Sequence, residues 1–321
     1  MITPDVYTIM DMFSFHRPRD SEVEQQFIDE YLTPLGFRRD EHLNLVLTIG
    51  ENPRILFSSH FDTVGRTEGY KELHYDGTLL TLSKQDKIDG FECLGADDTA
   101  GVWLMTEMVK ARIPGVYVIH YAEESGCIGS SAKAKDEEFF KNIKIAIAFD
   151  RMGTTDVITH QCSVRTASDA FALALAEQLG GGFIPDDSGV YTDTNEYAHI
   201  VPECTNISVG YYNQHGQNER QDVPFLIALR DTLMEVDWDA LPVERDPDVY
   251  ESLPRYTGGG WMTDYGPRKT TRNEDELYDL VRDYPDIAAL ILASLGVSVE
   301  DFEDQIYEDY GRGAAYVARK H

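Results

Sequence analysis

Short apolar runs of strand length alternate with stretches of helical periodicity over residues 1–240. The apolar runs predict strands at 43–49, 54–58, 115–121, 143–149 and 205–211. Capping residues followed by apolar positions three and four apart predict helices over 21–36, 97–108, 167–179 and 224–236. This alternation predicts an α/β fold in three layers, α/β/α, in which helices cover both faces of a mainly parallel mixed sheet.

The chain beyond residue 240 follows a different pattern. Residues 241–272 are rich in proline, glycine and charge, and they are predicted to be a loop or linker. Residues 273–321 carry the capping signals and apolar spacing of a small helical C-terminal extension. The apolar faces of these helices must be buried against another surface. Packing on the first domain and self-association or partner binding are two alternatives that the sequence leaves open.

Composition narrows the classes of partner. The chain has 321 residues and a formal net charge of -29, which argues against nucleic acid and against an anionic membrane surface. No basic segment followed by an apolar run opens the sequence, and its longest apolar stretch is too short to span a bilayer. The four cysteines are scattered without ligand spacing. We therefore expect a soluble, cytoplasmic protein with reduced thiols.

Residues of metal-binding type stand at the ends of the predicted strands and at the start of the predicted helix over 97–108. They are His60 and Asp62, Asp97, Glu123 and Glu124, and Asp150. Ligands of parallel sheets bind at the carboxyl ends of the strands. These side chains are therefore predicted to converge on one rim of the sheet.

Each of these residues, taken alone, also has a simpler interpretation. His60 fits an ordinary core or surface histidine, the Asp97-Asp98 pair fits a helix cap, and paired glutamates are common on solvated faces. Two features favour metal chemistry. In extended chain Asp62 lies on the same side as His60, where its carboxylate can fix the tautomer of a metal-bound imidazole. Neighbouring glutamates point in different directions, so one can bind a metal while the other faces a bound water.

The motifs in their order resemble those of the co-catalytic dizinc exopeptidases. This clan includes the leucyl aminopeptidases, tripeptidase T, the glutamyl aminopeptidases and the N-acyl amino acid deacylases. The resemblance covers about residues 21–236. It rests on His60-Phe61-Asp62-Thr63-Val64, Leu94-Gly95-Ala96-Asp97-Asp98-Thr99-Ala100-Gly101, Glu123-Glu124, Asp150, and the segment from Asn213 to Glu219 with His215. The residues of these motifs are most similar to those of the tripeptidase T and glutamyl aminopeptidase branch.

The resemblance implies two bound Zn²⁺ ions with Asp97 as the bridging ligand. His60 and Asp150 would complete one site, and Glu124 and His215 the other. Glu123 would be the general base, Asp62 would join it in the catalytic set, and a cis peptide is expected between Asp97 and Asp98. Nitrogen and carboxylate ligands suit Zn²⁺, and the predominance of carboxylates allows Mn²⁺ or Co²⁺ as a substitute.

Two features of the sequence bear on the substrate. Several branches of the clan carry an inserted lid or dimerisation domain, but the intervals from Asp62 to Asp97 and from Asp150 to His215 are too short for one. We therefore expect a bare catalytic domain over 1–240. Asp193, in a Thr-Asp segment similar to one in the clan, either meets a free α-amino group of the substrate or belongs to a capped turn.

We expect a metallo-aminopeptidase that removes the N-terminal residue from short peptides. One alternative is a dizinc deacylase or carboxypeptidase-like amidase that acts on small N-acyl amino acids. A second alternative is a non-catalytic binding protein on the same fold, for example one that acts through its C-terminal helices. Oligomerisation through these helices is a separate option that the sequence leaves open for the enzyme as well. The presence of Glu123 beside every expected ligand argues against this second alternative.

Overall fold

The computed structural model describes residues 3–252, which lie in a compact unit that extends over Met1–Leu253. The predicted extension over 273–321 and residues 253–272 of the predicted linker lie outside the described residues, so their organisation and any oligomerisation through them stay predictions. In the described range, no helix has the length and apolar character that crossing a membrane requires. All four cysteines are free thiols.

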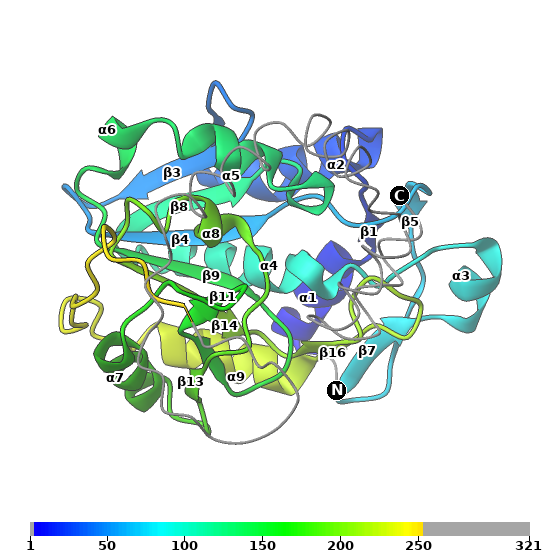
Figure 1. The fold of residues 1–321 in the computed structure, drawn as a ribbon. Coiled ribbons are helices and arrows are strands. Elements are labelled where there is room, and N and C mark those ends of the chain that lie inside the picture. Colours follow the sequence, from blue (N-terminus) through cyan, green and yellow to red (C-terminus); the bar gives the residue numbers. More distant parts are fainter. Residues whose placement is uncertain (1–2, 253–321) are drawn as a thin grey trace, which may run out of the picture. The chain divides into compact units, whose positions relative to one another are not determined.

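An eight-stranded mixed sheet forms the middle layer of this unit (Figure 1). From one edge to the other its strands are β13 (Ile184–Asp186), β10 (Asp156–Ile158), β14 (Glu203–Ser208), β9 (Ile145–Arg151), β4 (Ile55–His60), β8 (Gly115–His120), β3 (Leu45–Ile49) and β2 (Arg38–Arg39). The four central strands β14, β9, β4 and β8 run parallel, and β3, β2 and β10 pair in the antiparallel sense. The predicted mainly parallel mixed sheet is confirmed, and β2, β10 and β13 extend it beyond the predicted strands.

Helices surround the sheet, and three smaller sheets complete the unit. The helices are α1 (Pro4–Phe13), α2 (Glu22–Phe27), α3 (Lys84–Asp89), α4 (Ala96–Lys110), α5 (Ile128–Lys133), α6 (Glu137–Phe140), α7 (Asp169–Leu179), α8 (Asp193–Glu196) and α9 (Val223–Leu233), with short helical segments η1 (Ile28–Leu32), η2 (Thr33–Leu35) and η3 (Glu123–Ser125). A four-stranded side sheet joins β15 (Tyr211–Tyr212), β16 (Arg220–Asp222), β7 (Leu79–Leu82) and β6 (Leu73–Tyr75), and the two-stranded sheets are β1 (Phe15–His16) with β5 (Gly69–Tyr70) and β11 (His160–Gln161) with β12 (Val164–Arg165). In Figure 1 the side sheet lies to the right of the main sheet, next to α3.

Alternating side chains of the central strands feed two hydrophobic cores. On β4, Phe57 joins the larger core, which also contains the apolar faces of α1, α4, α7 and α9. Leu56, its neighbour, joins the smaller core with residues such as Phe140 of α6. Both faces of the sheet are therefore covered, as expected for a sheet whose central strands run parallel. All six residues of β4 are buried.

Side-chain caps begin three of the predicted helices, and the first of them, at Ser21, was predicted. Ser21 accepts a hydrogen bond from the backbone of Glu24, and Ser168 and Asp222 cap α7 and α9 in the same way. The predicted helix over 21–36 differs, because the structure divides it into α2, the π-helical η1 and the 3-10 segment η2. Pro34 lies in η2, and a proline has no N–H to donate and its ring clashes with the preceding turn. This chemistry accounts for the change of helix type before Gly36 ends the segment.

The close packing of α4 against β9 gives a test of the fold. A Cβ atom on Gly101 would lie 2.4 Å from the carbonyl oxygen of Phe149 and 2.6 Å from a carboxylate oxygen of Asp98. We expect Gly101→Ala to lower the free energy of unfolding by about 1–3 kcal/mol, because overpacking forces α4 away from the sheet. Urea unfolding measures the change, with Lys110→Ala on the exposed end of α4 as control. An unchanged midpoint would show that this packing is looser than described.

Candidate metal centre

Three parallel strands and one helix bring the predicted ligands to one rim of the sheet. His60 is the last residue of β4, and Glu123 and Glu124 lie in η3 just after β8. Asp150 is the last residue but one of β9. Asp97 lies at the start of α4, and His215 lies in the loop between β15 and β16. Because β8, β4 and β9 are hydrogen-bonded neighbours, their carboxyl ends place these side chains together.

Asp97 lies between the two histidines. Its Oδ1 atom is 3.0 Å from Nε2 of His60, and its Oδ2 atom is 3.1 Å from Nε2 of His215. Nε2 of His215 is also 3.1 Å from Oε1 of Glu124, while Nε2 of His60 is 3.9 Å from Oδ1 of Asp150. The two oxygens of one carboxylate therefore face two separate imidazoles, each with a further carboxylate beside it.

The same atoms form sets compact enough to hold cations. Ligand atoms lie within 4.8 Å of one another in three groups, which are His60, Glu123 and Glu124; His60, Asp98 and Asp150; and Asp97, Glu124 and His215. All five ligands expected from the resemblance occur in these groups. The group with His60 and Asp150 also contains Asp98, which was not expected as a ligand.

Asp150 is held from behind by hydroxyl groups. Thr192 donates a hydrogen bond to its Oδ2 atom at 2.8 Å, and Tyr211 donates to its Oδ1 atom at 3.0 Å. The side-chain amide of Asn206 pairs with the backbone N–H and C=O of Asp150. Tyr211 thus contributes to the site as well as to the core, and these three partners fix the direction in which the Asp150 carboxylate points.

Asp62 positions two other site residues. The backbone carbonyl of Asp62 is 3.0 Å from Nδ1 of His60, and its carboxylate lies farther, at 3.5 Å. The same carboxylate accepts a hydrogen bond from the backbone N–H of Glu123 at 3.1 Å. Asp62 is fully buried. It contacts the ring of His60 mainly through its backbone carbonyl, and its carboxylate makes the longer contact that the sequence predicted.

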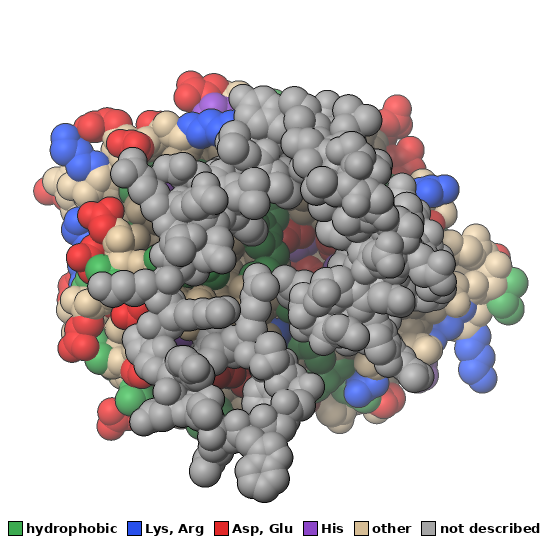
Figure 2. Space-filling view, viewed as in Figure 1, with side chains coloured by type: hydrophobic (Ala, Val, Ile, Leu, Met, Phe, Trp, Pro, Cys, Tyr) green, Lys and Arg blue, Asp and Glu red, His purple; other side chains and the backbone are tan. Residues whose placement is uncertain are grey.

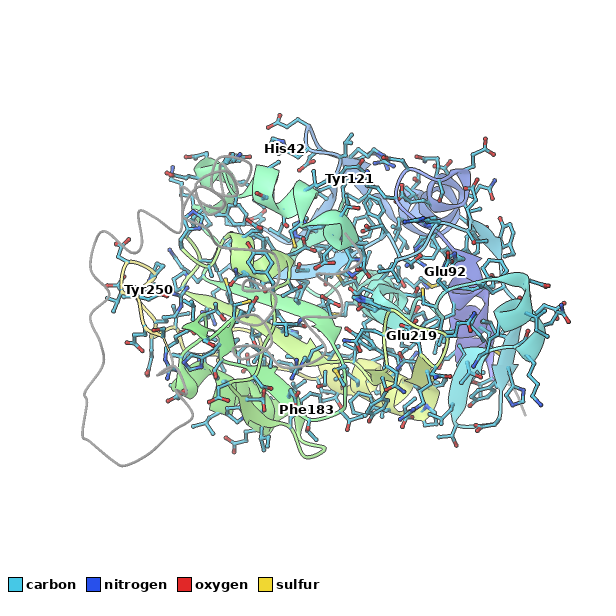
Figure 3. All side chains as sticks on the ribbon, turned by 45° about the vertical axis from the view of Figure 1, so that its right-hand side comes forward. His42, Glu92, Tyr121, Phe183, Glu219 and Tyr250 are labelled. Atoms are coloured by element: carbon cyan, nitrogen blue, oxygen red, sulfur yellow. The ribbon has the colours of Figure 1, made fainter. Side chains whose placement is uncertain are left out.

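The two aspartates at the start of α4 have different environments. Their peptide bond is cis, as the resemblance implied. Asp98 caps the helix through a hydrogen bond from the N–H of Gly101, while Asp97 faces the histidines. Glu219 accepts hydrogen bonds from the N–H groups of Gly95 and Asp97 at 2.7 and 3.1 Å, and Figure 3 shows it between the main sheet and the side sheet. The helix-cap interpretation therefore applies to Asp98 and not to Asp97.

Burial and crowding of like charges shift the pKa values of the cluster. Burial, together with neighbouring carboxylates, raises the pKa of Glu123, Glu124 and Asp150 above the ordinary range. Burial also opposes ionisation of Asp97, but the hydrogen bonds with His215 and His60 outweigh it and lower the pKa of that carboxyl. In His215 burial acts in the lowering direction, and the carboxylates of Asp97 and Glu124 beside its Nε2 atom raise the pKa to about 11.

The donor set fits divalent cations. Two imidazole nitrogens and several carboxylate oxygens converge, and Oε1 of Glu124 is buried without a hydrogen-bond donor although it lies 3.1 Å from Nε2 of His215. Throughout the described range, the only ion-pair partners of these carboxylates are the two histidines. Figure 2 shows acidic and histidine side chains together near the middle of this face, beside hydrophobic ones. Such a set suits Zn²⁺, with Mn²⁺ or Co²⁺ as substitutes.

Asp193 lies near the site but is already engaged. Its side chain is almost completely buried, and it accepts a hydrogen bond from the Ser130 hydroxyl at 2.5 Å. The preceding residue, Thr192, is the one that contacts Asp150. The Thr-Asp segment was predicted to act through Asp193, whereas the contact with Asp150 comes from the hydroxyl of Thr192.

Residues 44–183 match the model of peptidase family M28. Among solved structures, aminopeptidase PepT from Bacillus cereus has a TM-score of 0.58 and 18% identity, and the alignment covers 72% of this chain and 96% of that chain. A tripeptidase from Staphylococcus aureus has a TM-score of 0.55 and 18% identity, with coverage of 72% and 96%. The TET1 peptidase of Pyrococcus horikoshii, described as assembling into a tetrahedron or a large octahedral shell, has a TM-score of 0.51 and 16% identity, with coverage of 71% and 98%.

A search of curated proteins finds no match to this chain. The family match confirms the predicted resemblance to the co-catalytic zinc exopeptidases, and it confirms the predicted class of enzyme at the level of a metal-dependent peptidase. The structural neighbours confirm the fold.

The raised pKa of His215 predicts how the metal-free chain responds to pH. A histidine whose pKa is about 11 in the folded chain, against 6.5 ordinarily, contributes full stability below pH 6.5, and this contribution is lost as the pH rises toward 11. In excess chelator, the wild type should therefore exceed His215→Asn in Tm by most near pH 6, and by progressively less up to pH 10. Thermal unfolding by circular dichroism measures the difference. A gap that stays constant or widens with pH would contradict this assignment.

Proposed function

Since residues 44–183 match the model of peptidase family M28, we propose that this chain removes the N-terminal residue of short peptides with a water activated by two divalent cations, Zn²⁺ in the first instance. A metal-dependent exopeptidase is the coarser activity that the family match supports. The observation that carries the finer proposal is the position of Asp97, whose two carboxylate oxygens lie 3.0 and 3.1 Å from the imidazoles of His60 and His215.

Five residues would hold the cations. Asp97 would be shared, His60 and Asp150 would complete one site, and Glu124 and His215 would complete the other. When bound, the cations supply Lewis acidity, which lowers the pKa of a bound water and polarises a carbonyl. The supports of the ligands favour this assignment, because Asp150 and His60 each have partners that fix their direction.

Glu123 is placed to move the proton. Its Oε2 atom is 3.9 Å from Nε2 of His60, so it reaches the same space as the ligands, and its side chain is 14% exposed. Burial, together with the carboxylates of Asp193 and Glu124, raises its pKa well above the ordinary value for glutamate. A glutamate with a raised pKa takes a proton at a carboxylate oxygen and gives it up to the leaving amine, which is what peptide hydrolysis needs.

The hydrogen bond from the Glu123 backbone to Asp62 fixes where this base stands. The carboxylate of Glu123 itself accepts only a weak contact from the thiol of Cys127, at 3.6 Å. Its oxygens are therefore free of strong donors in the described structure, and they are available to a water and a substrate amine. Asp62 is a positioning residue in this proposal, because it touches Glu123 and His60 and not the reacting atoms.

Removal of the base tests the mechanism. Glu123→Gln keeps the shape of the side chain but cannot take up a proton, so kcat should fall by about 10²–10⁴-fold or more while the metal content stays at the wild-type level. Peptide hydrolysis and metal analysis of the same preparations measure both quantities. Glu137→Gln, on the exposed face of α6, serves as the matched control. Wild-type turnover in Glu123→Gln would remove this residue from the proposed mechanism.

The requirement for a free amine separates an aminopeptidase from a deacylase. The proposed enzyme should hydrolyse aminoacyl anilides and short peptides, and it should leave their N-acetylated forms intact, since acetylation removes the charged terminus. A panel of aminoacyl anilides, dipeptides and N-acetyl amino acids, assayed with Zn²⁺, Mn²⁺ and Co²⁺, measures this preference. Release of acetate from N-acetyl amino acids, with intact anilides, would instead favour the deacylase alternative.

A further inference from the structure

Arg17 is a completely buried arginine next to the proposed metal centre. It follows β1 and precedes α2, so it lies outside residues 44–183, which match the peptidase family. Its relative exposure is 0%, and its guanidinium carbon lies 4.0 Å from the centre of the Phe27 ring. Arginine is among the residues least often buried without a specific partner. The buried guanidinium of Arg17 is therefore expected to have specific hydrogen-bond acceptors.

The donors of Arg17 hold two different metal-binding segments. Its Nε atom donates to the backbone carbonyl of Phe61 at 2.6 Å, and its Nη1 atom donates to the hydroxyl of Thr99 at 2.8 Å. Its backbone N–H donates to the hydroxyl of Thr63 at 3.2 Å, and its carbonyl accepts from the N–H of Thr63 at 3.1 Å. Four hydrogen bonds thus connect one residue to the end of β4 and to the start of α4.

The acceptors are adjacent to ligands in the sequence. Phe61 directly follows His60, and Thr99 is the second residue after Asp97. The hydroxyl of Thr99 in turn donates to the carbonyl of Gly95, so a chain of two hydrogen bonds runs from Arg17 across the segment that contains Asp97. The separation between His60 and Asp97 depends on how these two segments are held together.

We propose that Arg17 is a positioning residue that fixes the His60 end of β4 against the Asp97 segment and thereby sets the affinity of the centre for metal ions. This inference rests on the metal centre of the proposed function. The planar guanidinium suits the task because it presents donors in fixed directions to acceptors on two segments. A lysine ammonium presents one point of donation and cannot hold both at the same geometry.

The charge of Arg17, considered without its positioning role, would weaken the binding of metal ions. A guanidinium near two cations repels them, so removal of its charge without any change in geometry would strengthen metal binding. The carboxylates of Asp98 and Asp62 attract the guanidinium and offset part of this repulsion. The two effects therefore differ in sign, and the direction of the change in affinity shows which of them dominates.

The affinity of the full chain for Zn²⁺ tests the proposal. We expect Arg17→Lys and Arg17→Met each to weaken Zn²⁺ binding at least about tenfold, as is typical when a residue that orients a metal ligand is replaced. Competition with a chelator of known affinity measures this in chelator-stripped protein, and the visible spectrum of the Co²⁺-loaded protein reports a change in ligand geometry. Unchanged or tighter Zn²⁺ binding in both variants would overturn the proposal.

Two further variants separate positioning from general loss of stability. Arg54→Met is the matched control, because Arg54 precedes β4 at its other end and donates to the carbonyls of Trp238, Asp239 and Leu241. It should lower Tm and leave the Zn²⁺ affinity within about threefold of wild type. Thr99→Val keeps the arginine but removes its acceptor, and should weaken Zn²⁺ binding in the same direction as Arg17→Lys. A loss of affinity in Arg54→Met as large as in Arg17→Met would overturn the proposal.

The measurement also distinguishes failure of this inference from failure of the proposed function. A wild-type chain that binds Zn²⁺, loses affinity in the Arg17 variants and hydrolyses no peptide would support the role of Arg17 and contradict the peptidase function. A wild-type chain that binds no Zn²⁺ would contradict both.

Discussion

The structure depends on holding several carboxylates together in a place that excludes much of the solvent. Asp97, Glu123, Glu124 and Asp150 all point to one rim of the sheet, and within the described residues their ion-pair partners are two imidazoles. Carboxylates brought this close repel one another, and burial raises the cost of each charge. Cations or protons must therefore complete the arrangement, and the protein must keep the ligands in place against their mutual repulsion.

The fold meets this demand by supporting His60, Asp97 and Asp150 from other segments. β4, β8 and β9 are adjacent parallel strands, so their hydrogen-bonded ladder sets the spacing of the ligands that follow them. In addition, Tyr211 and Thr192 donate hydrogen bonds to the carboxylate of Asp150, and Glu219 accepts one from the backbone N–H of Asp97. These three supports come from the chain that follows β9. Neither the ligands nor their supports belong to one local segment, which makes the site a product of the whole sheet.

The sequence predicts those parts of this arrangement that have a local signal. β4 begins with the apolar run Ile55-Leu56-Phe57 and ends in His60, and the cap at Ser21 and the apolar strand that leads to Asp150 are visible in the same way. β10 and β13 have only three residues each, which is too short for a periodic pattern, and Pro34 changes a helix type that apolar spacing does not register. Arg17 leaves no trace in the sequence, and the Thr-Asp segment does not reveal that Thr192 supports Asp150, because these roles arise from contacts between segments far apart in the chain. Arg17 and Thr99, for example, are 82 residues apart.

The buried cations beside the centre show which physical effect the fold favours there. The chain carries 57 acidic and 28 basic residues, yet two of the basic ones, Arg17 and Lys71, are buried next to the segments that should bind metal ions. Electrostatic attraction of a metal would be greater without them. Both, however, donate to backbone carbonyls beside the ligands, Arg17 to Phe61 at 2.6 Å and Lys71 to Leu94 at 2.6 Å. Charged donors make stronger hydrogen bonds than neutral ones, so they fix the main chain more firmly. The arrangement therefore sacrifices some attraction for the metal in return for a main chain that presents His60 and Asp97 at a defined separation.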